Sequence, residues 1–341
     1  MPLEQIDPDQ EVHGPAGPAP VRPPRSIRRT TTIDMTWPRG GFGSQLRLTG
    51  SARDAVTTDP AAPPQVVVTA STDVGVGPSR VIESISATPD TPNLDALVGC
   101  RGGGYLRAAL DQHLPTLRPS GAPLYLLLDD ISGTSLIAGV AWSRWIEWPP
   151  KLPPDMPSPG RNMEGVCIGF RPGSSALTDM EGRAMLNRMR AIGPLHHEDD
   201  EHGWHEIAEL PHVATRRARR IDVWRADDGS VVIDAGFQDS VGDPDHERMA
   251  VHEYEVRATA SADGILTSLD PVPRVLPFRE CPSAVAGAQA LVGTPLSELR
   301  QAVLERLART NGCTHLNDAI RALADVPHLL DVLDATLAAD G

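Results

Sequence analysis

Alternation of apolar and polar residues predicts strands in the first half of the chain. Residues 45–49 and 65–71 are predicted to be strands, the second of them with the apolar run Val66-Val67-Val68, and residues 80–87 alternate apolar and polar side chains and predict a third strand. Apolar residues then recur at helical spacing at 93–99 and 105–114. The first half of the chain therefore predicts strands that are followed by helices.

The second half repeats this order more clearly. Residues 219–225 and 230–235 are expected to form a hairpin around Asp228 and Gly229, which is a favoured turn pair. The further predicted elements are strands at 252–261 and 265–272 and helices at 282–292, 295–308, 316–324 and after Pro327. Because strands precede helices rather than alternate with them, the expected class is α+β, with an antiparallel sheet and helices packed on one face.

Short sequence echoes indicate that the two halves are copies of one domain. Residues 28–35 are echoed by 216–223, and residues 68–71 by 258–261, in the same order. We therefore expect two tandem α+β copies that form a pseudo-dimer. The predicted division is a disordered proline-rich arm at 1–25, a first copy at 26–145, a proline-rich linker and insert at 146–212, and a second copy at 213–341.

The insert and the loop after it carry weaker patterns. A short strand is expected at 163–170 and a helix at 181–192. Residues 196–205 are dense in histidines and acids, and a solvated loop is the favoured interpretation there over a metal site.

Composition argues against several classes of partner. The chain has 31 Lys and Arg residues against 45 Asp and Glu, and this net charge of −14 argues against nucleic-acid binding. Only 4% of the residues are aromatic, too few for a platform on which bases would stack. The apolar run at 124–142 is interrupted by Asp129 and Asp130, so a membrane-spanning helix is not expected. We expect a small-molecule substrate, with no nucleic acid and no membrane as partner, and leave a homo-oligomer open.

The cysteines and the first residues of the chain predict its cellular compartment. The first residues show no basic region followed by an apolar stretch, so no secretory signal is expected. Four cysteines in a chain of this size then indicate free thiols or metal ligands in a reducing compartment. The predicted location is the cytoplasm.

Cysteine and histidine gather at the starts of predicted helices in the second copy. Cys281 stands directly before Pro282, and Cys313 stands just before the helix at 316–324. Helix amino termini favour the thiolate, which is the form needed in a metal ligand or a nucleophile. The predicted metal ligands are His252, Cys281, Cys313 and His315, and the predicted catalytic residues are Cys313 and His315.

The first copy provides a comparison for these positions. It places Ala87, Tyr125 and Leu127 where the second copy has Cys281, Cys313 and His315. A cysteine before a helix is often only a small buried hydrophobic residue. If the fold requires neither thiol nor imidazole there, their presence in the second copy favours a site.

Two resemblances follow from these residues. The segments 28–37, 216–223, 278–293 and 312–316 resemble, over most of the chain, the DUF 2889 family of unknown function. More distantly, residues 249–324 are similar in layout to the U-type iron–sulfur cluster scaffold proteins, which implies a cluster site. In those scaffolds a histidine precedes the last cysteine, where this chain has Gly312, and a cysteine and an aspartate stand near Ala250 and His252. With two thiols and one or two histidines, a zinc or iron ion fits the sequence better than a cluster.

These observations leave several functions open. The first hypothesis is a metal-dependent enzyme of hydrolase or lyase type, in which His252, Cys281 and Cys313 hold zinc or iron and His315 is a fourth ligand or a proton shuttle. A metal-free form would use Cys313 as nucleophile, with His315 or His252 as base. The alternatives are a non-catalytic metal-binding or iron–sulfur module, and a structural pseudo-dimer without metal.

Overall fold

The computed structural model describes residues 13–41, 43–146, 163–179 and 184–339. Contacts between Cα atoms divide the chain into two compact units, each made of separate segments. Unit 1 comprises Met1–Gly17, Ser143–Gly193 and Arg225–Ala324, and unit 2 comprises Pro18–Trp142, Pro194–Trp224 and Asp325–Gly341. The predicted linker around residues 148–160 lies outside the described residues.

The sheet of unit 2 is antiparallel. Its strand order is β4 (Ile82–Thr88), β3 (Gln65–Val76), β2 (Leu46–Thr57), β1 (Ser26–Thr36) and β6 (Thr215–Arg225). Strand β1 is paired on both edges, because Ser26 lies opposite Thr57 on one side and Trp224 on the other. β6 therefore belongs with the first strands of the chain in space, although it lies about 180 residues later in the sequence.

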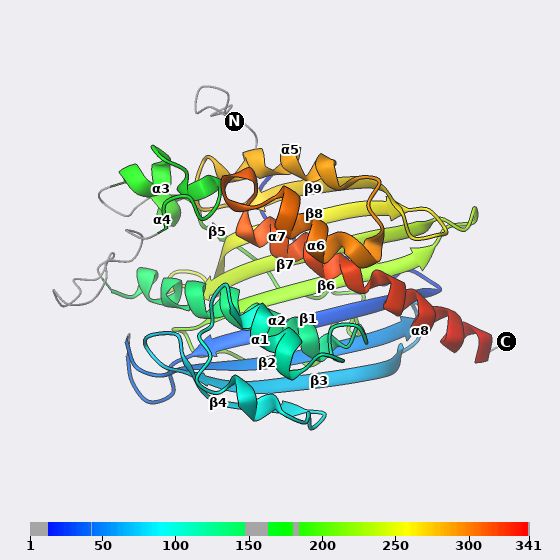
Figure 1. The fold of residues 1–341 in the computed structure, drawn as a ribbon, viewed down its shortest axis with the longest axis horizontal. Helices are drawn as coiled ribbons and strands as arrows, with labels where there is room; N and C mark the ends of the chain where they lie inside the picture. The colour runs from blue at the N-terminus through cyan, green and yellow to red at the C-terminus, as the bar shows by residue number, and fades with distance from the viewer. Residues whose placement is uncertain (1–12, 42, 147–162, 180–183, 340–341) are drawn as a thin grey trace. The chain divides into compact units, whose positions relative to one another are not determined.

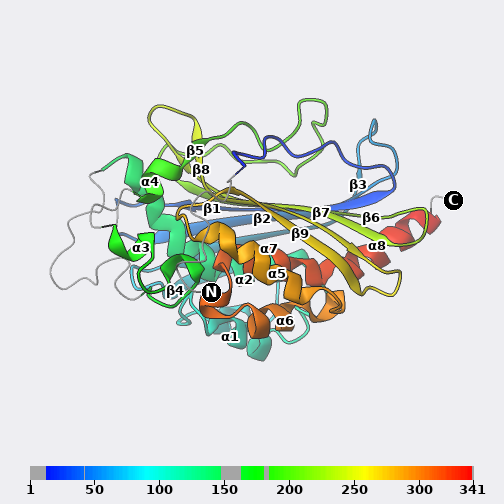
Figure 2. The ribbon, with the colours of Figure 1, turned by 90° about the horizontal axis from the view of Figure 1, so that it is seen from above.

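Helices cover one face of this sheet. They are η2 (Leu94–Leu97), α1 (Leu106–His113), α2 (Pro123–Ile137), which continues into η3 (Ala138–Arg144), and α8 (Val326–Ala339). Figures 1 and 2 show α1 and α2 on the same side of β1, β2 and β3. The core between them is apolar: Ile33, Leu48 and Val74 from the strands are buried together with Leu127 and Ile131 of α2.

The helix Pro123–Arg144 is long and apolar enough to cross a membrane by length and composition alone. Most of its apolar window, 72%, is buried inside the fold, as expected of a core helix. Its acids are buried as well, with Asp130 accepting hydrogen bonds from Arg217 and Arg219. Length and composition are therefore weak support for a membrane span.

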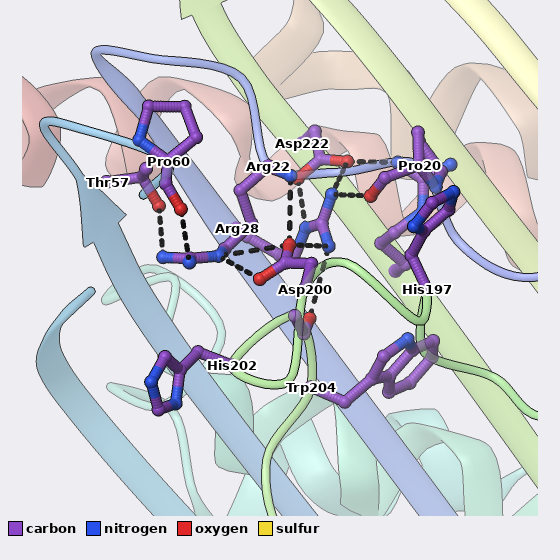
Figure 3. A network of polar contacts seen from close by, with 12 residues as sticks. Pro20, Arg22, Arg28, Thr57, Pro60, His197, Asp200, His202, Trp204 and Asp222 are labelled. Atoms are coloured by element: carbon purple, nitrogen blue, oxygen red, sulfur yellow. Dashed lines mark hydrogen bonds and ion pairs between the residues drawn. The ribbon is translucent and has the colours of Figure 1, made fainter. Parts of the chain in front are cut away.

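The other face of the unit 2 sheet carries a network of buried ion pairs (Figure 3). Nε of Arg22 lies 2.8 Å from Oδ1 of Asp200, and Nε of Arg28 lies 2.5 Å from Oδ1 of Asp222. Arg28 also donates to the backbone carbonyl of Gly203. These bonds fasten the segments around residues 18–25 and 194–205 to the strands.

This network changes the interpretation of two predicted segments. Asp200 and Trp204 are buried, so the loop at 196–205 is only partly solvated. His205 lies between Thr30 and Thr32, with its two ring nitrogens 2.8 and 2.9 Å from their hydroxyl oxygens. The predicted disordered arm lies partly outside the described residues, and its described part is bound rather than free, because Arg22 pairs with Asp200 and the amide of His13 donates to the carbonyl of Pro273.

Unit 1 is built around β8 (Arg248–Ala260). Along one edge β8 pairs with β7 (Val231–Gly242), and along the other with β9 (Leu266–Val275) and the short β5 (Arg190–Ala191), all antiparallel. The pairing of β7 with β8 shifts between Asp239 and Ser240, which is a β-bulge. Asp239 pairs with His252, next to this bulge, and bulges commonly redirect side chains beside functional sites.

Short helices pack on these strands, and α7 contacts both β7 and β8. From the end of β9 they are η5 (Cys281–Ser283), α5 (Ala284–Ala288), η6 (Gln289–Leu291), η7 (Leu296–Glu298), α6 (Leu299–Arg306), η8 (Arg309–Asn311), α7 (Thr314–Ala322) and η9 (Leu323–Asp325). The insert adds η4 (Ile168–Phe170), α3 (Ser175–Thr178) and α4 (Ala184–Arg188). Figure 2 shows α5 and α7 on one side of β7 and β9.

The predicted α+β class and the antiparallel pairing are confirmed, and the insert differs from its prediction. The strand expected at 163–170 is wrong, because Gly165 turns at a φ of +78° and its amide bonds back to the carbonyl of Phe170. The helix expected at 181–192 is described only as Ala184–Arg188, since Arg190 and Ala191 then pair with β8.

Candidate metal and thiol site

Two adjacent strands and one helix of unit 1 bring polar side chains together. Asp239 of β7 is the register partner of His252 of β8, and two residues along the ladder Phe237 is the partner of Tyr254. Residues two apart in a strand share a face, so both pairs lie on the side covered by α7. His315 stands in the first turn of α7 and completes the group.

The polar atoms of Asp239, His252 and His315 lie close together. Nδ1 of His252 lies 3.2 Å from Oδ2 of Asp239, and Nε2 of His315 lies 3.7 Å from the same oxygen. The two imidazole rings are stacked, with centroids 3.5 Å apart and planes inclined by 17°. One donor atom from each of the three residues falls within 4.8 Å of the other two.

The surroundings keep His252 neutral. Burial lowers the pKa of His252 to about 4, and the neighbouring His315 lowers it further, while Asp239 opposes the shift. Nδ1 of His252 is buried and lies 3.2 Å from Oδ2 of Asp239, but within the described part of the chain none of its contacts has hydrogen-bond geometry. A neutral imidazole with an unsatisfied buried nitrogen has the form that a metal ligand requires.

Two thiols lie next to this group, and each shifts the pKa of the other. A hydrogen bond from Cys281 holds the pKa of Cys313 well below its usual value, against the effect of burial, and His315 favours the same thiolate. The same hydrogen bond raises the pKa of Cys281 well above its usual value. Cys313 is therefore the more acidic thiol of the pair, and Cys281 the less acidic one.

Further groups favour the charge on Cys313. Cys313 is the residue before α7, and the backbone N–H of Leu316 in the first turn lowers its pKa. The Tyr254 hydroxyl donates to Cys313 as well, and burial followed by this negative charge raises the pKa of Tyr254. Tyr254 also approaches the carbonyl oxygen of Cys281 at 3.5 Å, so it spans the two cysteines.

His315 connects the thiolate to the carboxylate. Its Nδ1 lies 4.0 Å from Sγ of Cys313 and 3.5 Å from the hydroxyl of Thr314, and its Nε2 faces Asp239. The order thiolate, imidazole, carboxylate is that of a nucleophile, its base and the group that orients the base. The same three side chains can therefore support metal chemistry or thiol chemistry.

The insert adds a third cysteine to the site. The amide of Ile168 donates to the carbonyl of Gly312, one residue before Cys313, at 2.9 Å. A Cβ atom on Gly169 would lie 3.0 Å from Sγ of Cys281 and 3.8 Å from Sγ of Cys167, so the glycine permits close packing against both thiols. Burial, followed by the charge on Cys313, raises the pKa of Cys167 to about 11.

The structure places all four predicted site residues in unit 1. His252 and His315 stack on each other, Cys313 approaches His315, and Cys281 contacts Cys313. Sequence reasoning missed Asp239, Tyr254 and Cys167. Asp239 carried a readable signal, since it lies two residues after Phe237, on the same face of a strand whose register places it opposite His252.

The residues of the predicted first copy that were compared with the two cysteines lie at different places in the secondary structure. Ala87 lies within β4, whereas Cys281 follows β9 and opens η5. Tyr125 and Leu127 both lie inside α2, whereas Cys313 precedes α7. The equivalence of Ala87 with Cys281 is therefore not preserved in the secondary structure.

Comparisons with known proteins identify part of the chain. No curated protein and no solved structure matches it. A family model described as "Protein of unknown function (DUF2889)" matches residues 215–328, and this range contains Asp239, His252, Cys281, Cys313 and His315. The expected resemblance over most of the chain is thus supported only for this part, and no match supports the iron–sulfur scaffold resemblance. From β6 to the start of α8, this chain is similar to a family of unknown function, and this part of the chain contains every predicted site residue.

Proposed function

We propose that this chain is a metal-dependent enzyme in which Asp239, His252 and His315 hold one zinc or iron(II) ion. The observation that carries the proposal is the convergence of three donor atoms, one of them a buried imidazole nitrogen without a hydrogen bond. A buried polar atom left unsatisfied costs roughly 1–3 kcal/mol, and a bound ion would remove that cost.

The spacing of the donor atoms supports the proposal. Bonds of about 2.0–2.2 Å to a tetrahedral ion place its ligand atoms roughly 3.3–3.6 Å apart. The distances from Oδ2 of Asp239 to the two histidine nitrogens, 3.2 and 3.7 Å, bracket this range. Two imidazoles and one carboxylate occur in both catalytic zinc sites and iron(II) sites, which leave further positions open to water and substrate.

Within this proposal Cys313 acts on His315 rather than on the ion. Its sulfur lies near Nδ1 of His315, whereas Nε2 is the nitrogen that faces Asp239. A thiolate that accepts the Nδ1 proton fixes the tautomer in which Nε2 is free to bind metal. The predicted ligand set of His252, Cys281, Cys313 and His315 is thereby modified: Asp239 replaces the two cysteines.

The reaction follows from the chemistry of such an ion. A bound zinc or iron(II) ion lowers the pKa of water or polarises a carbonyl group, which suits a hydrolase or a lyase acting on a small organic molecule. The side chain of His315 is 15% exposed, while those of Asp239 and His252 are 0% and 7% exposed. Substrate is therefore expected to approach from the side of His315. The cytoplasmic location and the absence of nucleic-acid and membrane partners remain predictions from the sequence.

Metal analysis of the whole chain, purified without oxygen or chelator, tests the proposal. We expect about one zinc or iron per chain in the wild type, and its loss in Asp239→Asn and His252→Ala. His196→Gln, a change in an exposed histidine of unit 2, is the matched control and should leave the metal content unchanged. Cys281→Ala should also retain the ion. Metal content that persists in both Asp239→Asn and His252→Ala, or a wild type without metal, would contradict the proposal.

A second candidate is a metal-free thiol enzyme, and the chain of contacts Cys313–His315–Asp239 favours it. Cys313 would be the nucleophile and His315 its base, with Asp239 orienting the imidazole. Activity that survives chelation but is lost in Cys313→Ala would favour this candidate over the metal enzyme. A non-catalytic metal or iron–sulfur module is the remaining alternative, and a visible sulfur-to-iron absorbance would favour it.

We also infer that the chain contains two tandem copies of one fold. The order β1, β2, β3, β4, then η2, α1 and α2 is repeated by β6, β7, β8, β9, then α5, α6 and α7. In both series the consecutive strands from the second onward pair antiparallel. The repeated order supports a duplication in which the donor residues occur in the second series.

A further inference from the structure

Two arginines of unit 2 belong to segments that the backbone holds together. Arg80 lies in the turn between β3 and β4, and Arg101 lies between η2 and α1. Val81, the neighbour of Arg80, forms an isolated antiparallel bridge with Arg101, and the amide of Gly102 donates to the carbonyl of Arg80 at 2.7 Å. These backbone contacts fix the two arginines in one small region of the fold.

Neither of these two guanidinium groups is paired with an acid. Arg80 donates from Nε to the hydroxyl of Ser135 at 3.2 Å and from Nη2 to the carbonyl of Ser132 at 2.7 Å. Arg101 donates from Nε to the carbonyl of Ser79 at 3.1 Å. All these acceptors are uncharged, and within the described part of the chain neither arginine forms an ion pair with Asp or Glu. Nη1 of Arg80 and both terminal nitrogens of Arg101 also keep donors that these contacts do not use.

The two positive charges therefore repel each other without compensation. Burial, followed by the charge of Arg101, lowers the pKa of Arg80 to about 10. Arginine still keeps its proton at neutral pH, so the repulsion is present in the folded protein. Arg47 and Arg118, two other partly exposed arginines of unit 2, are each paired with an aspartate. An anion bound to Arg80 and Arg101 would remove their repulsion.

We propose that Arg80 and Arg101 bind the phosphate group of a small molecule, which is either inorganic phosphate or a phosphate monoester. This inference goes beyond the metal-dependent function and does not depend on it. Both arginines belong to unit 2 and lie outside the family match at 215–328, whereas the proposed metal ligands belong to unit 1.

Charge and donor number select phosphate over a carboxylate. Two cations without acidic partners match a dianion, whereas a carboxylate carries a single negative charge. A phosphate group also accepts hydrogen bonds from several donors at once, and the planar fork of arginine fits its oxygens. The net charge of −14 on the whole chain opposes a long polyphosphate such as a nucleic acid, so a single phosphate group is the expected ligand.

The glycines after Arg101 leave space for such a ligand. No heavy atom lies within 4 Å of the Cβ position of Gly104, and the nearest to that of Gly103 is the carbonyl oxygen of Arg101 at 4.0 Å. Arg101 itself is exposed, so the region is open to solvent. The amides of Gly103 and Gly104 donate no hydrogen bond to a described residue, and without side chains they can approach an anion closely. They add donors to a site whose charge comes from the arginines.

Isothermal titration calorimetry of the whole chain tests the proposal. The protein is first freed of metal by chelation, so that phosphate cannot bind through an ion in unit 1. Inorganic phosphate and ethyl phosphate are titrated at about pH 8, where a phosphate monoester is a dianion, and acetate is titrated at the same ionic strength. We expect at least one of the two phosphates to bind and acetate not to bind. Tighter binding of ethyl phosphate identifies a monoester as the ligand, and tighter binding of inorganic phosphate identifies the free ion.

Variants locate the binding. Arg101→Gln removes an exposed charge and should weaken phosphate binding by at least about ten-fold, the effect of losing a charge-assisted hydrogen bond. Arg118→Gln is the matched control, because Arg118 is paired with Asp111, and it should bind phosphate like the wild type. Arg80→Lys keeps the charge but loses the fork, and it should weaken binding less than Arg101→Gln does.

Hydrogen exchange with mass spectrometry gives a second measurement of the location. Phosphate should slow exchange of the amides at residues 102–105 in the wild type and not in Arg101→Gln. The proposal is overturned if neither phosphate binds more tightly than acetate, if Arg101→Gln binds phosphate like the wild type, or if the protected amides lie elsewhere. Because the chain is metal-free throughout, failure here leaves the proposed metal site intact, and a wild type without metal leaves this test intact.

Discussion

Two buried histidines, His205 and His252, have similarly lowered pKa values but differ in their hydrogen bonds. Burial lowers the pKa of both His205 and His252 to about 4. Both ring nitrogens of His205 are satisfied by Thr30 and Thr32, whereas Nδ1 of His252 has no hydrogen bond among the residues described here. A depressed pKa alone therefore does not identify a ligand, and the unsatisfied nitrogen of His252 is what distinguishes it.

His205 should make the stability of the protein depend on pH. Its folded pKa of about 4, lowered by burial and by Arg53 and Arg216, lies below the unfolded value of about 6.5. Between these values the unfolded chain binds a proton that the folded chain does not, so stability is complete above pH 6.5 and is lost as pH falls towards 4. This group contributes at most about 3 kcal/mol to the loss.

Urea unfolding at pH 7.5, 5.5 and 4.5 measures the effect of His205. His205→Gln keeps a polar side chain that does not titrate, and it should show a smaller loss of stability on acidification than the wild type. His196→Gln, in the exposed part of the same loop, should behave like the wild type. If the wild type and His205→Gln lose the same unfolding free energy on acidification, His205 does not have a lowered pKa in the folded protein.

Among the individual residues of the site, only some could be predicted from the sequence. The spacing of Cys313 and His315, just before a helix, was readable because helix starts can be located from N-cap and proline signals. Asp239 was not recognised, because a single acid in a strand is usually solvent-facing, and only the register opposite His252 makes it a buried partner. Cys167 requires knowledge of how the insert packs, which no local pattern encodes.

At the scale of elements, buried ion pairs hold α2 against β6 in unit 2. Asp130 on α2 accepts hydrogen bonds from Arg217 and from Arg219, all three being nearly fully buried. Gly133, one turn further along α2, leaves room for the guanidinium of Arg217, because a Cβ there would lie 2.5 Å from its Nη1. The close approach of α2 to β6 thus depends on this glycine.

Gly133→Ala should destabilise the protein despite the higher helix propensity of alanine. In an exposed helix this change stabilises by roughly 1 kcal/mol, but here the methyl group must displace Arg217 from Asp130. We expect a net loss of about 1–3 kcal/mol in the free energy of unfolding, the range for disturbing a buried ion pair or overpacking a core. Gly104→Ala is the control, since no atom lies within 4 Å of its Cβ position. Unfolding curves that coincide for Gly133→Ala and wild type would refute this role of Gly133.

Element prediction succeeded where one face of an element is exposed. The strands that became β8 and β9 were found because exposed or half-buried side chains on one face alternate with buried ones on the other. α2 was not predicted as a helix because twelve of its fifteen residues are buried, including Asp129 and Asp130, so no helical periodicity remains to read. The strand expected at 163–170 failed because a glycine turn, rather than alternation, determines that backbone.

At the scale of the molecule, the two compact units do not follow the predicted copies of 26–145 and 213–341. β6 and α8 fall in unit 2, since β6 pairs with β1 over ten residues and Arg29 of β1 binds Asp325 just before α8. Local patterns in the sequence predict the order of elements, whereas the compact units also depend on which strand edges meet. This explains why the element order was predictable and the spatial grouping was not.

Because all proposed donors lie in unit 1, metal should stabilise that unit specifically. A ligand that binds only the folded state at one hundred times its Kd adds about 2.7 kcal/mol to stability. Hydrogen exchange with mass spectrometry, on metal-free protein with and without added zinc, should show slower exchange in β7, β8 and the start of α7 and unchanged exchange in β1 to β4. His252→Ala should abolish the difference, while His196→Gln should retain it. Protection spread equally over both units, or protection that survives in His252→Ala, would place the ion elsewhere than between Asp239, His252 and His315.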